Sequence, residues 1–359
     1  MRVLLVGPYP PPHGGVQTHV VAIRGFLRAR GIPCVVVNIT RHRKTNSDDV
    51  YYPKSALGLI GVLLRLKYDI IHLHFGGDLT GRLLALGLVC TLMPRAKTVL
   101  TFHSGGYPSS TEGKAAAYWT VRGFVLRRFD AVVGVNAQLV EMFRRFGVLA
   151  ARTRAIAPHA VVDRQAGDPR DMADSLRRFY QTHSPVLLTV GGFEPEYVIP
   201  AQLDMLGSLR EKLPNAGLVV IGSGSLERDT REYARTKPYA EHALLCGDVP
   251  HAATLLAIAQ ADLLLRPTLY DGDSIAVREA LHLGTPVLAT DNGMRPSGVH
   301  LMTDVSPEAF SCRVMECLQR PTASPQNGEE GEQNLEAVLR LYSDLRPDLR
   351  PQQPATVWQ

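Results

Sequence analysis

The sequence of 359 residues has few cysteines, and their spacing excludes two common kinds of site. It contains no CxxC pair and no accompanying histidine spacing of the kind that a structural zinc site needs. We therefore expect reduced, mostly buried thiols, no metal site and a cytoplasmic location. The five cysteines are Cys34, Cys90, Cys246, Cys312 and Cys317.

Long apolar runs are also missing. The two longest, over 55–66 and 83–93, fall short of the roughly 18 to 20 residues that a bilayer span needs. The first apolar run, within 1–7, meets a proline cluster too early for a signal-peptide core. We expect no export by this route, and any membrane contact to be peripheral.

Charge of one sign is only slightly in excess, with 39 basic and 34 acidic residues and a formal net charge of +5. Such a balance permits an anionic partner without requiring one, and we expect no nucleic-acid partner. A hydrophobic fraction of 45% excludes a disordered or fibrous chain. The length favours two domains.

Short β-branched runs alternate with helical patterns, which predicts an α/β protein with parallel sheets. The pattern stops near residues 157–170 and then restarts. We expect two Rossmann-like, doubly wound domains facing a central cleft, over 1–165 and 166–333, with a helix in 334–359 that crosses back to the first domain. The predicted strands are 2–6, 34–38, 70–74, 98–102 and 131–135, then 186–190, 218–221, 243–246, 262–266 and 286–289, and one long helix is predicted over 114–128.

Candidate ligand-binding loops follow these strands, because ligands of open α/β sheets bind at the carboxyl ends of the strands. Glycines before a helix leave free N–H groups for a phosphate, although the spacing here is not the GxGxxG of a nicotinamide site. An imidazole at a strand end can donate or accept a hydrogen bond near neutral pH. The residues are Gly14 and Gly15, His103, Gly191 and Gly192, and Gly222 and Gly224; His72 and His74 are expected in the core.

An acidic element follows the strand at 262–266. Asp271 falls in the loop, and Glu279 lies inside the next helix, which Asp273 or Ser274 would cap. Compensation of the helix dipole explains an acid at the helix start, but it does not explain Glu279 beyond the first turn.

These motifs occur together in one order. The Gly14-Gly15 loop, the Thr-Phe-His sequence ending at His103, the Gly222-Ser223-Gly224 loop and the element from Asp271 to Glu279 resemble retaining GT-B glycosyltransferases of family 4. The resemblance covers roughly residues 1–345, and the set is specific for the family, though not for a substrate.

The resemblance implies transfer of a sugar from a nucleotide-diphosphate donor, without a required metal or other cofactor. The acceptor would be a glycan or a lipid-linked sugar in the synthesis of cell-surface polysaccharide or glycoconjugate. By the same resemblance, Gly15 would donate N–H groups to the diphosphate, and His103 would contact the donor sugar. Asp271 would bind sugar hydroxyls and Glu279 the ribose, and the backbone of Asp273, Ser274 and Ile275 would complete the cradle.

One motif departs from the family. Where an arginine and a lysine clamp the diphosphate, this chain has Gly192 and Tyr197, which suggests a subgroup with an altered clamp. We predict that Arg266 or Arg295 supplies the missing positive charge, and Arg278 beside Glu279 is a third candidate. The alternative is that these arginines form ion pairs of the scaffold.

The acceptor is expected on the N-terminal domain, where basic and aromatic residues are interleaved. Such a pattern suits an anionic lipid surface or a lipid-diphosphate acceptor, but it also fits a solvated helix face above a core. The residues are 41–44, Arg122, Arg127, Arg128, Arg144 and Arg145, beside Phe124, Leu126, Phe129, Phe143 and Phe146.

Three rival functions stay open. A non-hydrolysing nucleotide-sugar epimerase would share the fold and the donor, and a catalytically silent GT-B protein would fit the altered clamp. A nicotinamide oxidoreductase is disfavoured because GxGxxG is missing and two sets of loops are present.

Overall fold

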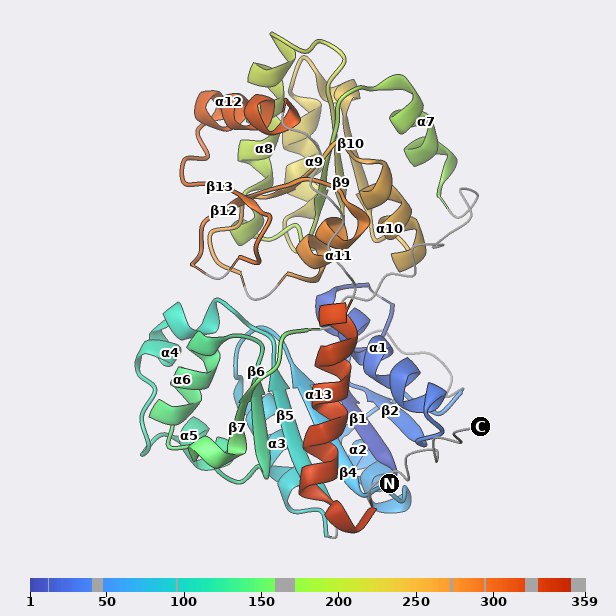
Figure 1. Cartoon of the computed structure of the whole chain (residues 1–359), viewed down its shortest axis with the longest axis vertical. Coiled ribbons are helices and arrows are strands. Elements are labelled where there is room, and N and C mark those ends of the chain that lie inside the picture. The colour runs from blue at the N-terminus through green and yellow to red at the C-terminus, as the bar shows by residue number, and fades with distance from the viewer. Residues whose placement is uncertain are drawn as a thin grey trace, which may run out of the picture. The chain divides into compact units, whose positions relative to one another are not determined.

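The computed structural model describes residues 1–11, 13–40, 48–94, 96–158, 172–271, 274–293, 295–319 and 329–349. It divides into two units, each built around one parallel sheet (Figure 1). The first unit comprises Met1–Pro11, Val16–His159 and Gly331–Gln359, and the second comprises Pro12–Gly15 and Ala160–Glu330. The predicted α/β class is therefore confirmed. The predicted boundary near residue 165 falls outside the described residues.

The first unit has a seven-stranded sheet in which neighbouring strands are parallel. Strand order reverses between β1 and β4, and such a reversal is where open α/β sheets bind ligands. In sheet order the strands are β3 (Val50–Tyr51), β2 (Cys34–Asn38), β1 (Val3–Gly7), β4 (Ile70–Phe75), β5 (Lys97–Phe102), β6 (Ala131–Gly134) and β7 (Thr153–Ala155). The sequence did not predict the short edge strands β3 and β7.

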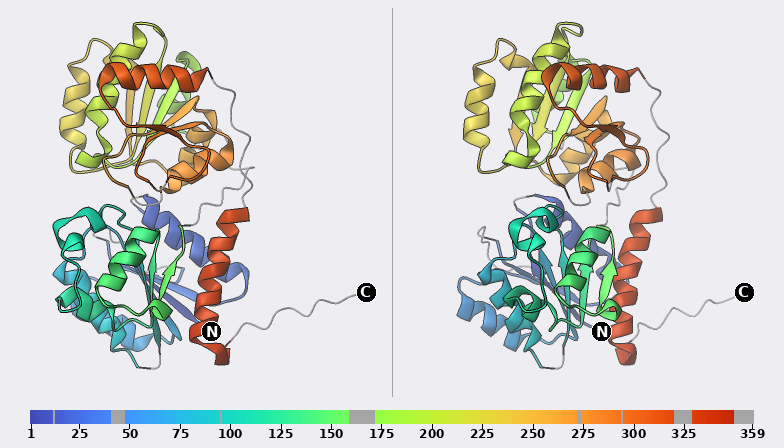
Figure 2. Two further views of the ribbon diagram at one scale, coloured as in Figure 1. Left: turned by 60° about the vertical axis from the view of Figure 1, so that its left-hand side comes forward. Right: turned by 90° about the vertical axis from the view of Figure 1, so that its left-hand side faces the viewer.

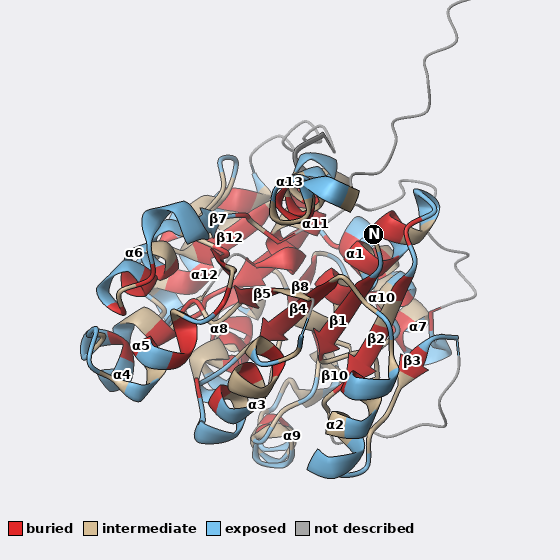
Figure 3. Ribbon diagram, turned by 90° about the horizontal axis from the view of Figure 1, so that it is seen from below, coloured by how far each residue is buried: buried red, intermediate tan, exposed pale blue. Residues whose placement is uncertain are grey.

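Both faces of this sheet are covered, so its strands are apolar on both sides (Figure 3). Leu4 and Val6 of β1 belong to one core cluster, and Val3 and Leu5 belong to the other. One face packs against α1 (Gly15–Ala29) and α13 (Glu329–Leu345), and the other against α2 (Ala56–Arg65), α3 (Gly81–Thr91), α5 (Val121–Leu126) and α6 (Ala137–Arg145). The C-terminal helix α13 thus completes the core of a sheet that begins the chain (Figure 2).

The single helix predicted over 114–128 is wrong. The structure has α4 (Thr111–Lys114), an irregular segment, and then α5. The Thr120 side chain accepts a hydrogen bond from the backbone N–H of Gly123 and so starts α5 as an N-cap. A Cβ at Gly123 would lie 2.8 Å from the carbonyl oxygen of Phe146, so only glycine permits this close packing.

The second unit has a six-stranded parallel sheet, in which the strand order reverses between β8 and β11. In sheet order the strands are β10 (Ala243–Gly247), β9 (Gly217–Ile221), β8 (Val186–Val190), β11 (Leu263–Arg266), β12 (Val287–Thr290) and β13 (His300–Met302). One face packs against α8 (Ile199–Arg210), α9 (Glu227–Arg235) and α12 (Pro307–Leu318), and the other against α7 (Asp174–Thr182), α10 (His251–Gln260) and α11 (Ile275–Leu283). The sequence did not predict β13.

All five cysteines are free thiols: Cys34, Cys90 and Cys317 are buried, Cys246 is half-buried and Cys312 is exposed. Within the described residues, no helix combines the length and the apolar character that crossing a bilayer requires.

Candidate functional site

Two glycine loops of the second unit meet where β8 and β9 end. Gly222 has φ +141°, and a Cβ there would lie 1.7 Å from the carbonyl oxygen of Gly191, so no other residue fits. A Cβ on Gly224 would lie 2.5 Å from the carbonyl oxygen of Phe193. The predicted residues Gly191, Gly222 and Gly224 are therefore brought together, and their missing side chains allow the two loops to pack against each other.

Tyr197 packs its ring against the loop after β8. A Cβ on Gly191 would lie 2.0 Å from Tyr197 Cε1, and one on Gly192 would lie 3.3 Å from Cε2. The Arg266 guanidinium carbon lies 4.8 Å from the centre of the same ring, a cation–π arrangement. Tyr197 therefore links the loop after β8 to Arg266.

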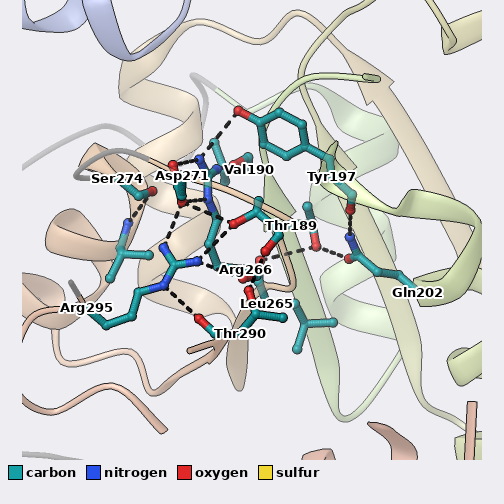
Figure 4. Close-up of polar contacts among 12 residues, drawn as sticks. Thr189, Val190, Tyr197, Gln202, Leu265, Arg266, Asp271, Ser274, Thr290 and Arg295 are labelled. Atoms are coloured by element: carbon teal, nitrogen blue, oxygen red, sulfur yellow. Dashed lines mark hydrogen bonds and ion pairs between the residues drawn. The ribbon is translucent and has the colours of Figure 1, made fainter. Parts of the chain in front are cut away.

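Arg266, Asp271 and Arg295 form a buried charge cluster at the end of β11 (Figure 4). Arg266 donates to both carboxylate oxygens of Asp271, at 2.7 and 3.0 Å, and Arg295 Nη1 donates to Asp271 Oδ2 at 2.7 Å. The side chains are 9%, 9% and 4% exposed, in that order. Two cations and one anion leave this cluster with a net charge of one positive unit.

Burial and pairing act in opposite directions on these groups. Burial by itself would raise the pKa of Asp271, but the two guanidiniums together lower it below its usual value. Burial would likewise lower the pKa of Arg266, but the Asp271 carboxylate and the Tyr197 hydroxyl together raise it. Arg266 and Asp271 are therefore charged at neutral pH.

Glu279 lies on α11, is 3% exposed and accepts a hydrogen bond from His251 Nε2 at 2.6 Å. Burial would lower the pKa of His251, but the hydrogen bond and the charge of Glu279 raise it. His251 opens α10 directly after β10 and is missing from the residues predicted from sequence. The sequence did offer a signal for His251, because this residue follows the carboxyl end of a predicted strand.

Helix α11 begins as the sequence predicts, because the Ser274 side chain accepts a hydrogen bond from the backbone N–H of Val277. Ile275 is the first residue of the helix, and Arg278 lies on it next to Glu279. Asp273 lies outside the described residues, so its predicted role stays a prediction.

In the first unit, His103 joins a cluster of imidazoles at the ends of β4 and β5. His103 Nε2 lies 3.3 Å from His74 Nδ1, and the rings of His72 and His74 are 4.1 Å apart between centroids. His19 of α1 lies 5.2 Å from His103 between ring centroids. His72 also contacts Tyr342 of α13, at 2.5 Å between Nδ1 and the hydroxyl oxygen.

Burial keeps these imidazoles neutral. It lowers the pKa of both His72 and His103 to about 3, and it lowers that of His74 well below the usual value. Imidazole nitrogens of His19, His74 and His103 lie within 4.8 Å of one another, a spacing that could hold a transition-metal ion. The same nitrogens could equally hold the hydroxyls of a sugar.

Gly14 and Gly15 lie between β1 and α1, and α1 begins at Gly15 with no acidic residue in its first turn. No carboxylate in the first turn of α1 therefore competes for the N-terminal N–H groups of this helix. Their contact with a phosphate stays a prediction.

The interleaved residues predicted as an acceptor surface separate into two sets. Leu126, Phe129, Phe143 and Phe146 are core residues, at most 1% exposed, so their inclusion as exposed residues was wrong. Phe124 is 49% exposed, so it stays a candidate for the predicted acceptor surface. The basic residues 41–44 lie outside the described residues.

Comparison with protein families gives two matches that together span most of the chain. Residues 1–159 match the family described as "Glycosyl transferase 4-like domain", and residues 176–302 match "Glycosyl transferases group 1". A curated relative from Mycobacterium tuberculosis, "GDP-mannose-dependent alpha-(1-6)-phosphatidylinositol monomannoside mannosyltransferase", is 25% identical and covers 83% of this chain and 82% of its own. "Sulfoquinovosyl transferase SQD2" of Arabidopsis thaliana is also 25% identical, over 68% of this chain and 48% of its own.

Solved structures share the fold. Anabaena HepE in complex with UDP-glucose has a TM-score of 0.68 at 15% identity and covers 96% of this chain and 95% of its own. A UDP-GlcNAc 2-epimerase of Methanocaldococcus jannaschii has a TM-score of 0.61 at 14% identity, over 95% of this chain and 100% of its own. The predicted GT-B fold, with two Rossmann-like units, is thereby confirmed.

Proposed function

The chain belongs to glycosyltransferase family 4, whose members are retaining enzymes with nucleotide-sugar donors, and we propose that it glycosylates a lipid-linked or glycan acceptor at the cytoplasmic membrane surface. The proposed product is a cell-surface polysaccharide or glycoconjugate. Support for a lipid acceptor comes from the mannosyltransferase relative, whose name gives a phosphatidylinositol mannoside as its substrate.

The pairing of Glu279 with His251 is the observation that carries this proposal. Its carboxylate is 3% exposed and lies on the helix that follows β11, next to the reversal of strand order where such sheets bind ligands. One oxygen accepts from His251, which leaves the other oxygen for the hydroxyls of a ribose. His251 thereby orients the carboxylate toward a donor nucleotide.

We propose that the cluster of Arg266, Asp271 and Arg295 takes the role of the arginine and lysine that clamp the diphosphate in the family. Arg266 and Arg295 share one carboxylate, so one positive charge is left uncompensated at the end of β11. A cation fixed in a buried site stabilises the negative charge that develops on a leaving phosphate more strongly than a hydrated cation does. In this proposal Asp271 holds both arginines in place, in addition to the contact with sugar hydroxyls that the family suggests.

The reaction needs no further reactant. The bond between the anomeric carbon and the diphosphate oxygen breaks, and a bond to the acceptor hydroxyl oxygen forms on the same face of the sugar. The acceptor proton passes to the departing phosphate oxygen, so no general base is assigned. His103 is proposed to contact the donor sugar as a neutral imidazole through Nδ1, because Nε2 lies 3.3 Å from His74 Nδ1.

A donor screen tests the proposal. A ligand that binds only the folded chain raises its melting temperature, so UDP-, GDP- and ADP-sugars are compared by thermal shift, and the best donor is then incubated with membrane lipid extract. We expect one donor to stabilise the chain and a glycosylated lipid to form, identified by mass spectrometry. Glu279→Gln should lower turnover at least tenfold, whereas Glu316→Gln, an exposed residue of α12, should leave it unchanged.

The epimerase is the rival that the fold alone cannot separate, since a UDP-GlcNAc 2-epimerase shares it. Incubation with the donor and no acceptor separates the two functions. Interconversion of two nucleotide sugars would overturn the proposal, and slow hydrolysis to the free sugar would support it. No stabilisation by any nucleotide sugar would instead favour a catalytically silent binding protein.

A further inference from the structure

The segment 111–154 of the first unit carries the entire charge excess of the chain. It contains eight basic residues (Lys114, Arg122, Arg127, Arg128, Arg144, Arg145, Arg152, Arg154) and three acidic residues (Glu112, Asp130, Glu141), and eight minus three gives the +5 of the whole sequence. The other residues are balanced. This local excess of positive charge suits an anionic partner.

Large apolar side chains gather in the same segment and face solvent. Trp119 is 91% exposed, Val121 71%, Phe124 49% and Tyr118 47%. Val121 and Phe124 lie three residues apart on α5, so they share one face, while Val125 and Leu126 of the same helix point into the core. The exposed face is therefore a fixed feature of a packed helix.

Arginines lie directly against these aromatic rings. The Arg127 guanidinium carbon lies 3.7 Å from the centre of the Tyr118 ring, and that of Arg128 lies 5.7 Å from the Phe124 ring. The rings of Tyr118 and Trp119 meet edge to face at 4.8 Å between centroids. We call Tyr118, Trp119, Val121, Phe124, Arg127 and Arg128 the basic aromatic surface; Figures 1 and 3 show α4 and α5 at the edge of their unit.

Few carboxylates of the described residues pair with the arginines of segment 111–154. Arg127 donates to the carbonyl oxygens of Tyr118 and Phe146, and Arg152 to those of Arg127 and Phe129. Arg145 likewise donates to two carbonyl oxygens, of Gly113 and Lys114. Within the part of the chain that the structure describes, only Arg122 and Arg144 of the eight basic residues pair with carboxylates of the segment, Glu112 and Glu141.

The geometry points to the basic aromatic surface as the site where this chain docks on an anionic lipid bilayer. Tryptophan and tyrosine rings suit the boundary between headgroups and acyl chains, and arginines beside them reach the lipid phosphates. Each basic residue near an anionic membrane adds to the attraction. The inference rests on the proposed function in placing the chain at a membrane, and it deepens that function by assigning the surface that docks, whatever sugar is transferred.

Vesicle flotation tests the docking without donor or acceptor, so its outcome is independent of the enzyme assay. The chain is mixed with vesicles of phosphatidylcholine and phosphatidylglycerol in equal parts, and with vesicles of phosphatidylcholine alone. We expect binding to the mixed vesicles, lost at high salt, and weak binding to the neutral ones. Equal binding to both, or none to the mixed vesicles, would overturn the inference.

Substitutions locate the surface. Trp119→Ser should weaken partitioning to the mixed vesicles about tenfold, and Arg128→Gln about fivefold. The matched control is Leu57→Ser on α2, which removes a side chain that is 81% exposed in the same unit and should leave binding unchanged. If Leu57→Ser lowers binding as much as Trp119→Ser does, the surface is assigned wrongly.

Fluorescence gives a second measurement that a folding defect cannot imitate. The sequence has two tryptophans, Trp119 and Trp358, so Trp358→Phe leaves Trp119 as the single reporter. Its emission should shift to shorter wavelength with the mixed vesicles and stay unchanged with the neutral ones. Self-association that Trp119→Ser abolishes, without vesicle binding, would assign the surface to a second copy of the chain and overturn the inference.

Discussion

The two units have the same architecture, yet their strand ends hold ionisable groups in opposite ways. In the first unit, burial removes the charge from a cluster of imidazoles, so that His72, His74 and His103 are neutral at physiological pH. In the second unit, ion pairing offsets the effect of burial, so that Arg266 and Asp271 stay charged beside Arg295. A neutral cluster suits hydrogen bonds to an uncharged sugar, and a charged cluster suits a diphosphate.

The difference between the two clusters follows from the partners that lie within hydrogen-bond distance of each ionisable group. The carboxylate of Asp271 contacts two guanidiniums, and their attraction repays the loss of water. Within the described residues, His72 contacts the hydroxyls of Thr101 and Tyr342, and His74 contacts the imidazole of His103. Hydroxyls do not compensate a positive charge, so the neutral form is favoured.

The largest effect is expected from breaking the charged cluster. Arg266→Met removes two hydrogen bonds to Asp271 and leaves a buried carboxylate with Arg295 as its remaining guanidinium partner, which should lower the free energy of unfolding of the second unit by about 3 kcal/mol. Hydrogen exchange of β8 and β11 measures the loss, and β1 and β4 of the first unit should stay unchanged.

The matched control for this variant is Arg313→Met on α12. Arg313 pairs with Glu316, whose side chain is 54% exposed, so its loss should cost less than about 1 kcal/mol. Equal losses in the two variants would show that the Arg266 cluster is no more important to the fold than a surface ion pair.

Acid should act on the first unit. The folded pKa of His72 is about 3, below its usual value of 6.5, so protons favour the unfolded chain. The stability that depends on neutral His72 is full above pH 6.5 and is lost as the pH falls toward 3, at about 1.4 kcal/mol for each pH unit. At pH 4 we expect a loss of about 3 kcal/mol from this group.

Hydrogen exchange of β4 and β5, corrected for the intrinsic rate at each pH, measures this slope. His72→Gln cannot take up the proton, so it should be less stable at neutral pH but lose less stability in acid. An unchanged slope in the variant would mean that His72 is protonated in the folded chain.

Sequence patterns predicted the buried strands well, because a strand covered on both faces is a continuous apolar run, as in β1 and β9. They missed β3, β7 and β13, which have two or three residues each and lie at sheet edges. They also missed the break before α5, where Thr120 caps the helix and Gly123 permits its close packing.

The candidate site was predicted as residues but not as contacts. Asp271 and Glu279 were found because they belong to one local element. The pairing of Arg295 with Asp271 joins residues that are 24 positions apart, and that of His251 with Glu279 joins residues 28 apart. No local pattern encodes such contacts, because they depend on which strand ends become neighbours in the sheet.

A smaller effect is expected from His251, which lies at the strand ends of the second unit and whose pKa is raised. Its charge stabilises the fold fully below its unfolded pKa, about 6.5, and this contribution is lost as the pH rises through the raised folded pKa. His251→Gln should cost about 1 to 2 kcal/mol below pH 6 and less above pH 8. Ring NMR should show the His251 pKa falling in Glu279→Gln; an unchanged value would mean that the contact does not persist in solution.

The smallest effect on stability is expected at the basic aromatic surface, which makes Arg128→Gln a probe of charge alone. Arg128 is exposed, and in the described residues it contacts the Phe124 ring rather than a carboxylate. The free energy of unfolding should therefore change by less than about 0.5 kcal/mol. Because the segment 111–154 has a net charge of +5, removing one cation should stabilise slightly at low salt and not at high salt. A loss above about 1 kcal/mol would give Arg128 a structural role, like that of Arg266, and remove the contrast between the two kinds of arginine.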